Sequence, residues 1–443
     1  PRHSMSVTTT TTSNSYLESL LAGRPQLPAV LASPAVAWLN RLRADAVDRV
    51  GALTVPTTRD EEWRFTDISP LTKIPFQPAR SATRLTPEDI ERFTLPEAAA
   101  RLVFVDGVYV PQLSFNNAGV VVENLAPGAS QQGATLEAHL GRYAEFQHNA
   151  FAALNTAFLQ DGALIAAPRD AAVAAPIHLL FVATRQDVAA HPRCLVVAEA
   201  GSEITVIEDF VALQDEVYFT NAVTEIEVGD AARVRHIRVQ RESGKAFHIA
   251  NCAVKLAHAS RYQSVSVAFG ARISRYNLNV LQAADGIECA IDGLALITGR
   301  QLADTHTLID HARPHGVSRQ LHKCIVGGAA HAVFNGKIMV RPGAQLTDSS
   351  QSSRNLLLTS KAHVDTKPQL EIFADDVKCA HGATVGQLDA EEVFYLTSRG
   401  LTDAAARNLL TYAFGAEIID RIPVATLRHR LEQTVLEQTN RES

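Results

Sequence analysis

Glu199-Ala200-Gly201-Ser202-Glu203-Ile204-Thr205-Val206-Ile207 is one copy of a pattern that recurs along the chain. Its turn returns 28 residues later as Glu227-Val228-Gly229-Asp230, and Ala257 and Asp285 continue the same spacing. A unit of this length cannot bury its own apolar face. Units that repeat at a fixed period therefore stack, so that neighbouring units cover one another.

Around this stretch, from about residue 172 to 388, short runs of β-branched residues alternate with small or turn-forming residues, and helical periodicity is almost absent. Many short strands would also suit a β-sandwich or a barrel. The regular spacing, without hairpin turn pairs such as Asn-Gly, favours a β-helix or solenoid instead. We therefore predict a mainly β fold built around a stacked β core.

The sequence predicts helical regions on both sides of this core. Residues 15–165 are expected to form an N-terminal, mainly helical domain that turns strand-like over 101–125. Residues 166–388 form the predicted β core, and residues 389–443 a C-terminal helical domain. Residues 1–14 are predicted to be an expression remnant followed by a disordered start.

Capping signals divide the C-terminal region into three predicted helices. Asp389, with Glu392 three residues later, resembles a capping box that starts the first helix. Gly400 stops it, and Thr402 is the expected N-cap of the second. Pro423 separates the second helix from a charged third helix that runs to about residue 440.

The composition narrows the function classes. The 443 residues carry a net charge of −6, which gives no basic signature of nucleic-acid binding. No apolar run is long enough to span a bilayer and no secretory leader is present, so a soluble, intracellular protein is expected. The chain contains no phosphate loop, dinucleotide fingerprint, nucleophile elbow or His-Glu-x-x-His motif. We therefore predict that it does not bind or hydrolyse nucleotides by itself.

The best candidate for chemistry is Cys379-Ala380-His381, which follows Asp375 and Asp376. On a strand, Cys379 and His381 point to the same face. A soft sulfur beside a borderline nitrogen suits iron, zinc or an iron–sulfur cluster. The residue types alone equally permit a buried structural cysteine with a hydrogen-bonded histidine. The five cysteines are far apart and include no Cys-x-x-Cys pair, which favours reduced thiols over a disulfide framework.

A second group of histidines lies upstream. Their spacings of 5, 4, 7 and 9 fit neither one strand face nor a known metal template. We interpret them as hydrogen-bonded or exposed side chains on successive turns of the solenoid. The group comprises His306, His311, His315, His322 and His331.

The C-terminal half of the chain resembles a known family. The segments that carry the resemblance are Val333-Phe334-Asn335-Gly336-Lys337-Ile338, Asn355-Leu356-Leu357-Leu358, Pro368-Gln369-Leu370-Glu371-Ile372, residues 374–386 and Phe394-Tyr395-Leu396-Thr397-Ser398-Arg399-Gly400, with a weaker match at Glu61-Glu62-Trp63-Arg64-Phe65-Thr66-Asp67. They are similar to the SufB/SufD family of the SUF iron–sulfur cluster assembly system. The SufB branch is expected to have a Glu-His-Glu-Ala-type segment where this chain has residues 379–383, so the resemblance is to the SufD branch.

This resemblance implies a right-handed parallel β-helix between N- and C-terminal helical domains. It implies a complex with SufB and two copies of the ABC-type ATPase SufC, and a homodimer when the chain is alone. His381, with Cys379 as a secondary thiol, would hold a transient iron–sulfur cluster or iron at the interface with SufB. The expected location is the cytoplasm, or the plastid stroma in a plastid-bearing organism.

The resemblance further implies that SufC docks on the C-terminal helical domain. The residues expected there are Phe394, Tyr395, Leu396, Arg399, Leu409, Leu410 and Phe414. The second helix also carries an apolar face that includes Ala406 and Ala413.

Two alternatives remain open at this level. One is a β-helix enzyme that acts on carbohydrate, although such enzymes usually have a groove of acidic residues or arginine and are typically secreted. The other is a purely structural adaptor in which Cys379 and His381 belong to the core. The first interpretation, a non-enzymatic scaffold for iron–sulfur cluster assembly, is the only one that uses the cysteine–histidine pair.

Overall fold

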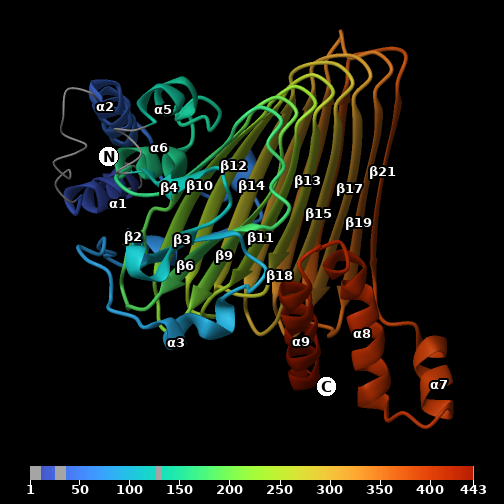
Figure 1. The fold of residues 1–443 in the computed structure, drawn as a ribbon. Coiled ribbons are helices and arrows are strands. Elements are labelled where there is room, and N and C mark those ends of the chain that lie inside the picture. The colour runs from blue at the N-terminus through green and yellow to red at the C-terminus, as the bar shows by residue number, and fades with distance from the viewer. Residues whose placement is uncertain (1–10, 25–35, 126–131, 443) are drawn as a thin grey trace, which may run out of the picture.

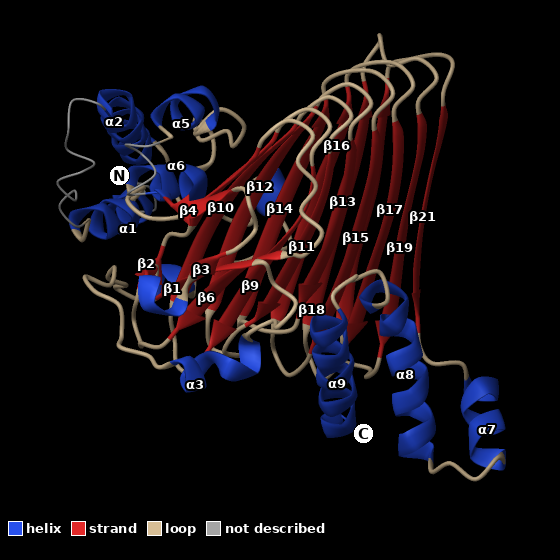
Figure 2. Cartoon of the chain, in the orientation of Figure 1, coloured by secondary structure: helices blue, strands red, loops and turns tan. Residues whose placement is uncertain are grey.

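The computed structural model describes residues 11–24, 36–125 and 132–442. Most of this chain forms a parallel β-solenoid, a stack in which each turn contributes one strand to each of two facing sheets (Figure 1). Helices gather near the first turns and beside the last ones, as Figure 2 shows. The predicted fold class, a mainly β protein with a parallel stacked core and helical regions at both ends, is confirmed.

The first sheet has 11 strands, in the order β2-β1-β6-β9-β11-β13-β15-β17-β19-β21, with β3 paired to β1. Its strands are β1 (Ala100–Val105), β2 (Val108–Tyr109), β3 (Phe115–Asn116), β6 (Ile177–Ala183), β9 (Glu203–Ala212), β11 (Arg233–Arg241), β13 (Arg261–Ala268), β15 (Glu288–Ile297), β17 (Val317–Val326), β19 (Asp348–Leu357) and β21 (Lys378–Gly386).

The second sheet has 10 strands, in the order β20-β18-β16-β14-β12-β10-β8-β5-β4, with β7 paired to β10. Its strands are β4 (Val121–Asn124), β5 (Ala163–Ala167), β7 (Ala189–Ala190), β8 (Arg193–Ala198), β10 (Phe219–Val228), β12 (Phe247–Leu256), β14 (Ile273–Gln282), β16 (Leu302–His311), β18 (His331–Val340) and β20 (His363–Ile372).

The helices lie outside this stack. The α-helices are α1 (Thr11–Ala22), α2 (Ala37–Ala52), α3 (Pro87–Ile90), α5 (Gly133–His139), α6 (Ala150–Ala157), α7 (Ala390–Ser398), α8 (Asp403–Ile419) and α9 (Ala425–Glu442). The 3-10 turns are η2 (Glu61–Trp63), η3 (Leu71–Lys73), η4 (Glu91–Phe93) and η5 (Pro111–Leu113). None of the helices in the described residues has the length and apolar character that a membrane crossing requires.

The repeat inferred from the turns is real but not uniform. Arg233 pairs with Arg261, an offset of 28 residues, whereas His331 pairs with His363, an offset of 32. The long strands hold a constant length of about ten residues, and the connecting turns absorb the difference. A parallel ladder tolerates this because only the strands must stay in register.

The stack begins before the predicted core boundary at residue 166. Strand β1 pairs in parallel with β6, and β5 pairs in parallel with β8. Most of the segment predicted to be a disordered start, residues 1–14, lies outside the described residues, and helix α1 begins at Thr11.

The N-terminal helices are fixed to the stack by a buried ion pair. Arg193 on β8 donates to Glu225 on β10 at 2.6 Å, and both side chains are fully buried. Arg193 also donates to the side chains of Asn155 and Thr156 on α6, each at 3.1 Å. The carboxylate of Glu225 also accepts hydrogen bonds from three backbone N–H groups, those of residues 141, 143 and 144, at 2.8–3.0 Å. This pair therefore joins α6 and the segment before it to two turns of the solenoid.

The C-terminal helices pack on the outer face of the first sheet. Helix α8 contacts β15 and β17, and Gly415 lets it approach closely, because a Cβ there would lie 3.3 Å from Ile325. Lys323 on β17 donates to the carbonyl of Phe414 and pairs with Glu417. Helix α7 extends away from the stack in Figure 1.

The predicted helix starts are found in the structure. The side chain of Asp389 accepts from the backbone N–H of Glu391, and that of Thr402 accepts from Ala405. Helix α9 follows Pro423, as predicted. The capping-box partner Glu392 makes no described contact with Asp389, so only half of that motif forms.

Replacing Arg193 by alanine should destabilise the fold strongly, because it leaves the Glu225 carboxylate buried without its cation. Breaking such a buried pair costs about 3–5 kcal/mol. The matched control is Arg261→Ala, whose partner Glu288 is about half exposed and whose loss should cost about 1 kcal/mol or less. Chemical denaturation of both variants measures the difference. Equal denaturation midpoints for the two variants would show that the buried ion pair contributes no more to stability than the exposed one.

Candidate functional site

The last turn of the solenoid carries the predicted cysteine–histidine pair. Strand β21 is the last strand of the first sheet and pairs only with β19, in a register that places Cys379 beside Ser349 and His381 beside Gln351. Ser349 and Gln351 are buried, whereas the residue between them is only half-buried, so both point between the two sheets. Cys379 and His381 therefore share the inward-facing side, as the sequence predicts.

In the described part of the chain no further turn covers this side, so the two residues are accessible. Cys379 is half-buried and packs at the edge of a small apolar cluster with Ala344 and Leu370, while His381 is exposed. Partial burial raises the pKa of the Cys379 thiol above its ordinary value. The exposure of His381 contradicts the alternative in which both residues belong to the core.

The interior beneath the pair is polar. His311 hydrogen-bonds to Ser318 at 3.0 Å, and Ser318 to Ser349 at 2.6 Å, which leads along the stack toward Cys379. In the neighbouring row, Gln351 donates to Gln320 at 2.8 Å, below His381. Earlier turns are filled mainly by valine, leucine, isoleucine and phenylalanine, together with a buried group of charged residues that includes His236 and Glu208. The final turns are therefore lined by groups that can hydrogen-bond to a polar or ionic ligand.

The pair by itself is an incomplete metal site. Among the residues that the structure describes, no third histidine, cysteine or carboxylate joins Cys379 and His381 at ligand distance. Asp375 and Asp376 are exposed, and Asp376 has a turn role, since its carbonyl accepts from Leu346. Further ligands would have to come from another chain or from the cargo.

The residues predicted to dock a partner divide into two groups. Phe394 and Tyr395 on α7 are 73% and 57% exposed, and Leu409 on α8 is 45% exposed, all unusually high for large apolar side chains. Arg399 is exposed and lies over the Tyr395 ring. Leu396, Leu410 and Phe414 are only half-buried, and Phe414 packs against the solenoid.

The apolar face predicted for α8 packs only in part. Ala406 is buried, but Leu409 and Ala413 are exposed. The buried residues of this helix include Thr411 and Gly415 instead. Helical spacing alone could not find them, because a threonine and a glycine do not count as apolar.

Three of the histidines of residues 306–331 are held by separate partners, in agreement with their interpretation as hydrogen-bonded or exposed side chains. His306 pairs with Asp304 and Glu62, His311 with Ser318, and His322 stacks on Phe334. His306 also lines a cleft of about 640 Å³ between the N-terminal region and the second sheet, together with Trp63 and other residues. They do not converge on one point.

Sequence reasoning missed a charged network inside the solenoid. His236 binds Glu208 at 2.9 Å and the hydroxyl of Tyr262 at 3.0 Å, and His248 binds Glu242 at 2.6 Å. Burial alone would raise the pKa of Glu208, but the hydrogen bond and charge of His236 lower it to about 2. The alternation of side chains along a strand cannot reveal such a network. In the sequence, a charged residue that faces the interior cannot be distinguished from one that faces solvent.

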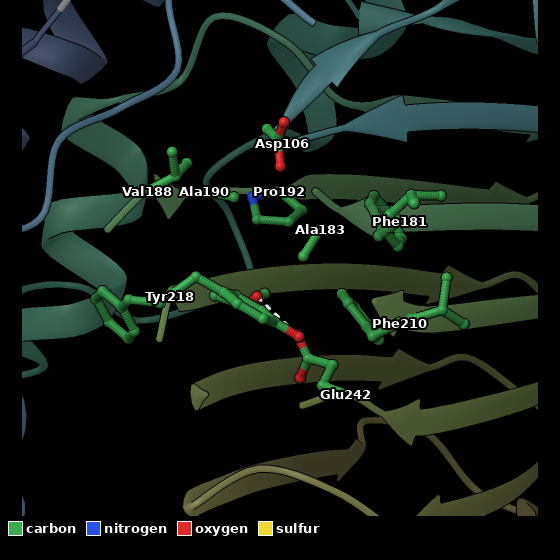
Figure 3. A pocket seen from close by; sticks show the side chains of 14 residues that line it. Asp106, Phe181, Ala183, Val188, Ala190, Pro192, Phe210, Tyr218 and Glu242 are labelled. Atoms are coloured by element: carbon green, nitrogen blue, oxygen red, sulfur yellow. Dashed lines mark hydrogen bonds between the residues drawn. The ribbon is translucent and has the colours of Figure 1, made fainter. Parts of the chain in front are cut away.

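This network adjoins a small internal cavity. Figure 3 shows Asp106, Phe181, Phe210, Tyr218 and Glu242 around it. Its free space is about 20 Å³, enough for a water molecule but not for an organic ligand. The network is therefore a satisfied interior rather than a binding site.

The chain is similar to proteins of iron–sulfur cluster assembly. The family model "SUF system FeS cluster assembly, SufBD core domain" matches residues 181–414, and "SufBD protein N-terminal region" matches residues 24–179. An iron–sulfur cluster assembly SufBD family protein of Synechocystis is 44% identical, over 89% of each chain. Iron–sulfur cluster assembly protein SufD of Escherichia coli is 35% identical over 83% of this chain and 85% of its own length. Protein ABCI7, chloroplastic, of Arabidopsis thaliana is 31% identical over 90% and 85%.

Alkylation of the native protein should modify Cys379 alone, because the four other cysteines are buried with raised thiol pKa values. The thiolate is the reactive form, so a raised pKa makes labelling slow at neutral pH and still increasing above pH 9, the ordinary value. Mass spectrometry after iodoacetamide treatment measures the sites, and Cys379→Ser should abolish the native label. Labelling of a second cysteine in folded protein would contradict this assignment.

Proposed function

Because the chain belongs to the SufBD family of iron–sulfur cluster assembly proteins, we propose that it is a non-enzymatic scaffold subunit whose last turn helps to hold a nascent cluster. The observation that carries this proposal is the position of Cys379 and His381, accessible on the inward side of an uncovered turn. The cluster is cargo here, built and then passed on.

The partner at this end would be SufB. Strands β20 and β21 end the two sheets, so one side of each has no strand to pair with, and an open edge of this kind invites pairing with another chain. Apolar side chains lie near it, with Phe373 61% and Val385 49% exposed. A second solenoid placed edge to edge would continue the ladder, cover these side chains and bring in the missing ligands. A second copy of this chain would use the same edge when SufB is absent.

Within that interface, His381 would bind iron through its neutral imidazole, and Cys379 would be a secondary thiol ligand. The raised pKa of Cys379 keeps the thiol protonated until a metal ion or a cationic neighbour removes the proton. In the joined complex, an iron ion that is also bound by the partner's ligands would supply such a cation.

SufC, the expected ATPase, would dock on α7 and the adjoining part of α8. Phe394, Tyr395 and Leu409 provide the exposed apolar anchors, and Arg399 a polar neighbour. Helices α8 and α9 connect this patch to the first sheet through Lys323, Glu417 and the cluster around Ile418. A movement of the ATPase would reach the solenoid along this connection. The carbohydrate-enzyme alternative gains no support from the family to which the chain belongs.

His381→Ala should leave the complex with SufB and SufC intact but lower its iron and acid-labile sulfide, on the order of tenfold, because a ligand is lost. Co-expression of the three proteins, anaerobic purification and chemical analysis measure this. The matched control is His258→Ala, an exposed histidine on an earlier turn. Equal iron content in both variants would remove His381 from the site.

The double change Phe394→Ala and Tyr395→Ala should weaken SufC binding by roughly thirtyfold or more, as expected for removal of aromatic anchors worth at least about 2 kcal/mol. Binding of SufB should be unchanged. Phe373→Ala is the reciprocal control and should weaken association with SufB only. Isothermal titration with each partner gives the affinities, and a loss of SufB binding in the double variant would refute the assignment of the two surfaces.

A further inference from the structure

Two histidines stand side by side on the second sheet, at the first positions of β18 and β20. The ladder pairs His331 directly with His363, although 32 positions separate them in the sequence. Their ring centroids are 4.9 Å apart, the spacing of neighbouring strands. The pairing register therefore brings two imidazoles together that could not be predicted to be neighbours from their spacing in the sequence.

A carboxylate completes the group. Asp365 lies two residues after His363 and so projects from the same face of β20. Its Oδ2 atom is 2.7 Å from Nε2 of His331 and 3.2 Å from Nε2 of His363. Both imidazoles thus direct the same ring nitrogen toward one carboxylate oxygen.

We propose that His331, His363 and Asp365 form a binding site for a divalent first-row transition-metal ion. Their three ligand atoms all lie within 4.8 Å of one another, and in the described part of the chain this is the only such group of histidine, cysteine or carboxylate residues. Two imidazole nitrogens and one carboxylate oxygen suit Fe²⁺, Co²⁺, Ni²⁺ or Zn²⁺ rather than Mg²⁺ or Ca²⁺.

The site is both preformed and open. All three residues belong to paired strands, so the ladder fixes their backbone positions before any ion arrives. The side chains of His331 and Asp365 are 26% exposed and that of His363 is 65% exposed. Three protein ligands with access to solvent leave further coordination positions for water or for a ligand from another molecule.

Other histidine–carboxylate contacts in the molecule lack these properties. His258 contacts the carboxylate of Asp285, but in the described residues no second imidazole joins them at ligand distance. His306 contacts two carboxylates, but Arg275 is 2.6 Å from one of them, Asp304, and already supplies a positive charge. Among the residues that the structure describes, only the group of His331, His363 and Asp365 brings two imidazoles and a carboxylate to ligand distance.

This site does not depend on the proposed function. It lies on the second sheet, whereas Cys379 and His381 belong to β21 of the first sheet. Metal binding by the isolated chain tests it without any partner or cluster.

The test is a Co²⁺ titration of the full chain with Cys379→Ser and His381→Ala already introduced, so that the other candidate ligands are absent. Visible absorption of bound Co²⁺ should saturate at one equivalent, and Zn²⁺ should displace it. Asp365→Asn, which keeps the side-chain shape, and His363→Ala should each weaken Co²⁺ binding by roughly tenfold or more.

The control is His258→Ala, which should leave the titration unchanged. Because His363 is largely exposed, its replacement should not shift the unfolding midpoint, and this is checked on the same samples. Absence of Co²⁺ binding before the changes at 363 and 365, or unaltered affinity after them, would overturn the site and leave the three residues as a surface ion-pair cluster.

Discussion

The parallel hydrogen-bond ladder is the constraint on which the rest of this structure depends. Each strand in the middle of the stack satisfies its backbone groups against a neighbour on both sides, one turn before and one turn after. The first turns meet helices and short antiparallel strands, which cover that end. At the other end β20 and β21 each have only one neighbour. The ladder therefore leaves an unpaired edge where the chain carries its cysteine–histidine pair.

The side chains in the interior of the solenoid also change from the first turns to the last. Large apolar side chains fill the early turns, and a buried network of glutamate, histidine and arginine is satisfied within them. Toward the end, serine and glutamine side chains replace the apolar ones and hydrogen-bond from turn to turn. A polar interior lowers the stability of the fold only slightly at an open end of the stack, because polar groups without a hydrogen-bond partner can bind water or another molecule there. The final turns therefore present hydrogen-bonding groups at the open end of the stack.

The family to which the chain belongs suggests a reason for this arrangement of the cysteine–histidine pair at an open end. In the proposed function the cluster is cargo that is held for a short time, which requires ligands that are accessible but incomplete. Cys379 and His381 meet both conditions. The helices that rest on β15 and β17 carry a second exposed surface on α7. One stack therefore carries both of the surfaces to which the proposed function assigns partners.

The sequence by itself determined the stacked β core, the helix starts at Asp389 and Thr402, and the shared face of Cys379 and His381. These depend on local rules: a repeat too short to bury itself, a side chain that caps a helix, and the alternation of a strand. The tertiary structure alone decided which turn ends the ladder, which face of α8 packs, and that His331 meets His363 and Asp365. From β5 onward, paired strands are offset by 26 to 32 residues in the sequence, and the connecting turns absorb this difference without changing the register within the strands. Contacts between side chains on neighbouring strands therefore cannot be predicted from the sequence until the pairing of the strands is known.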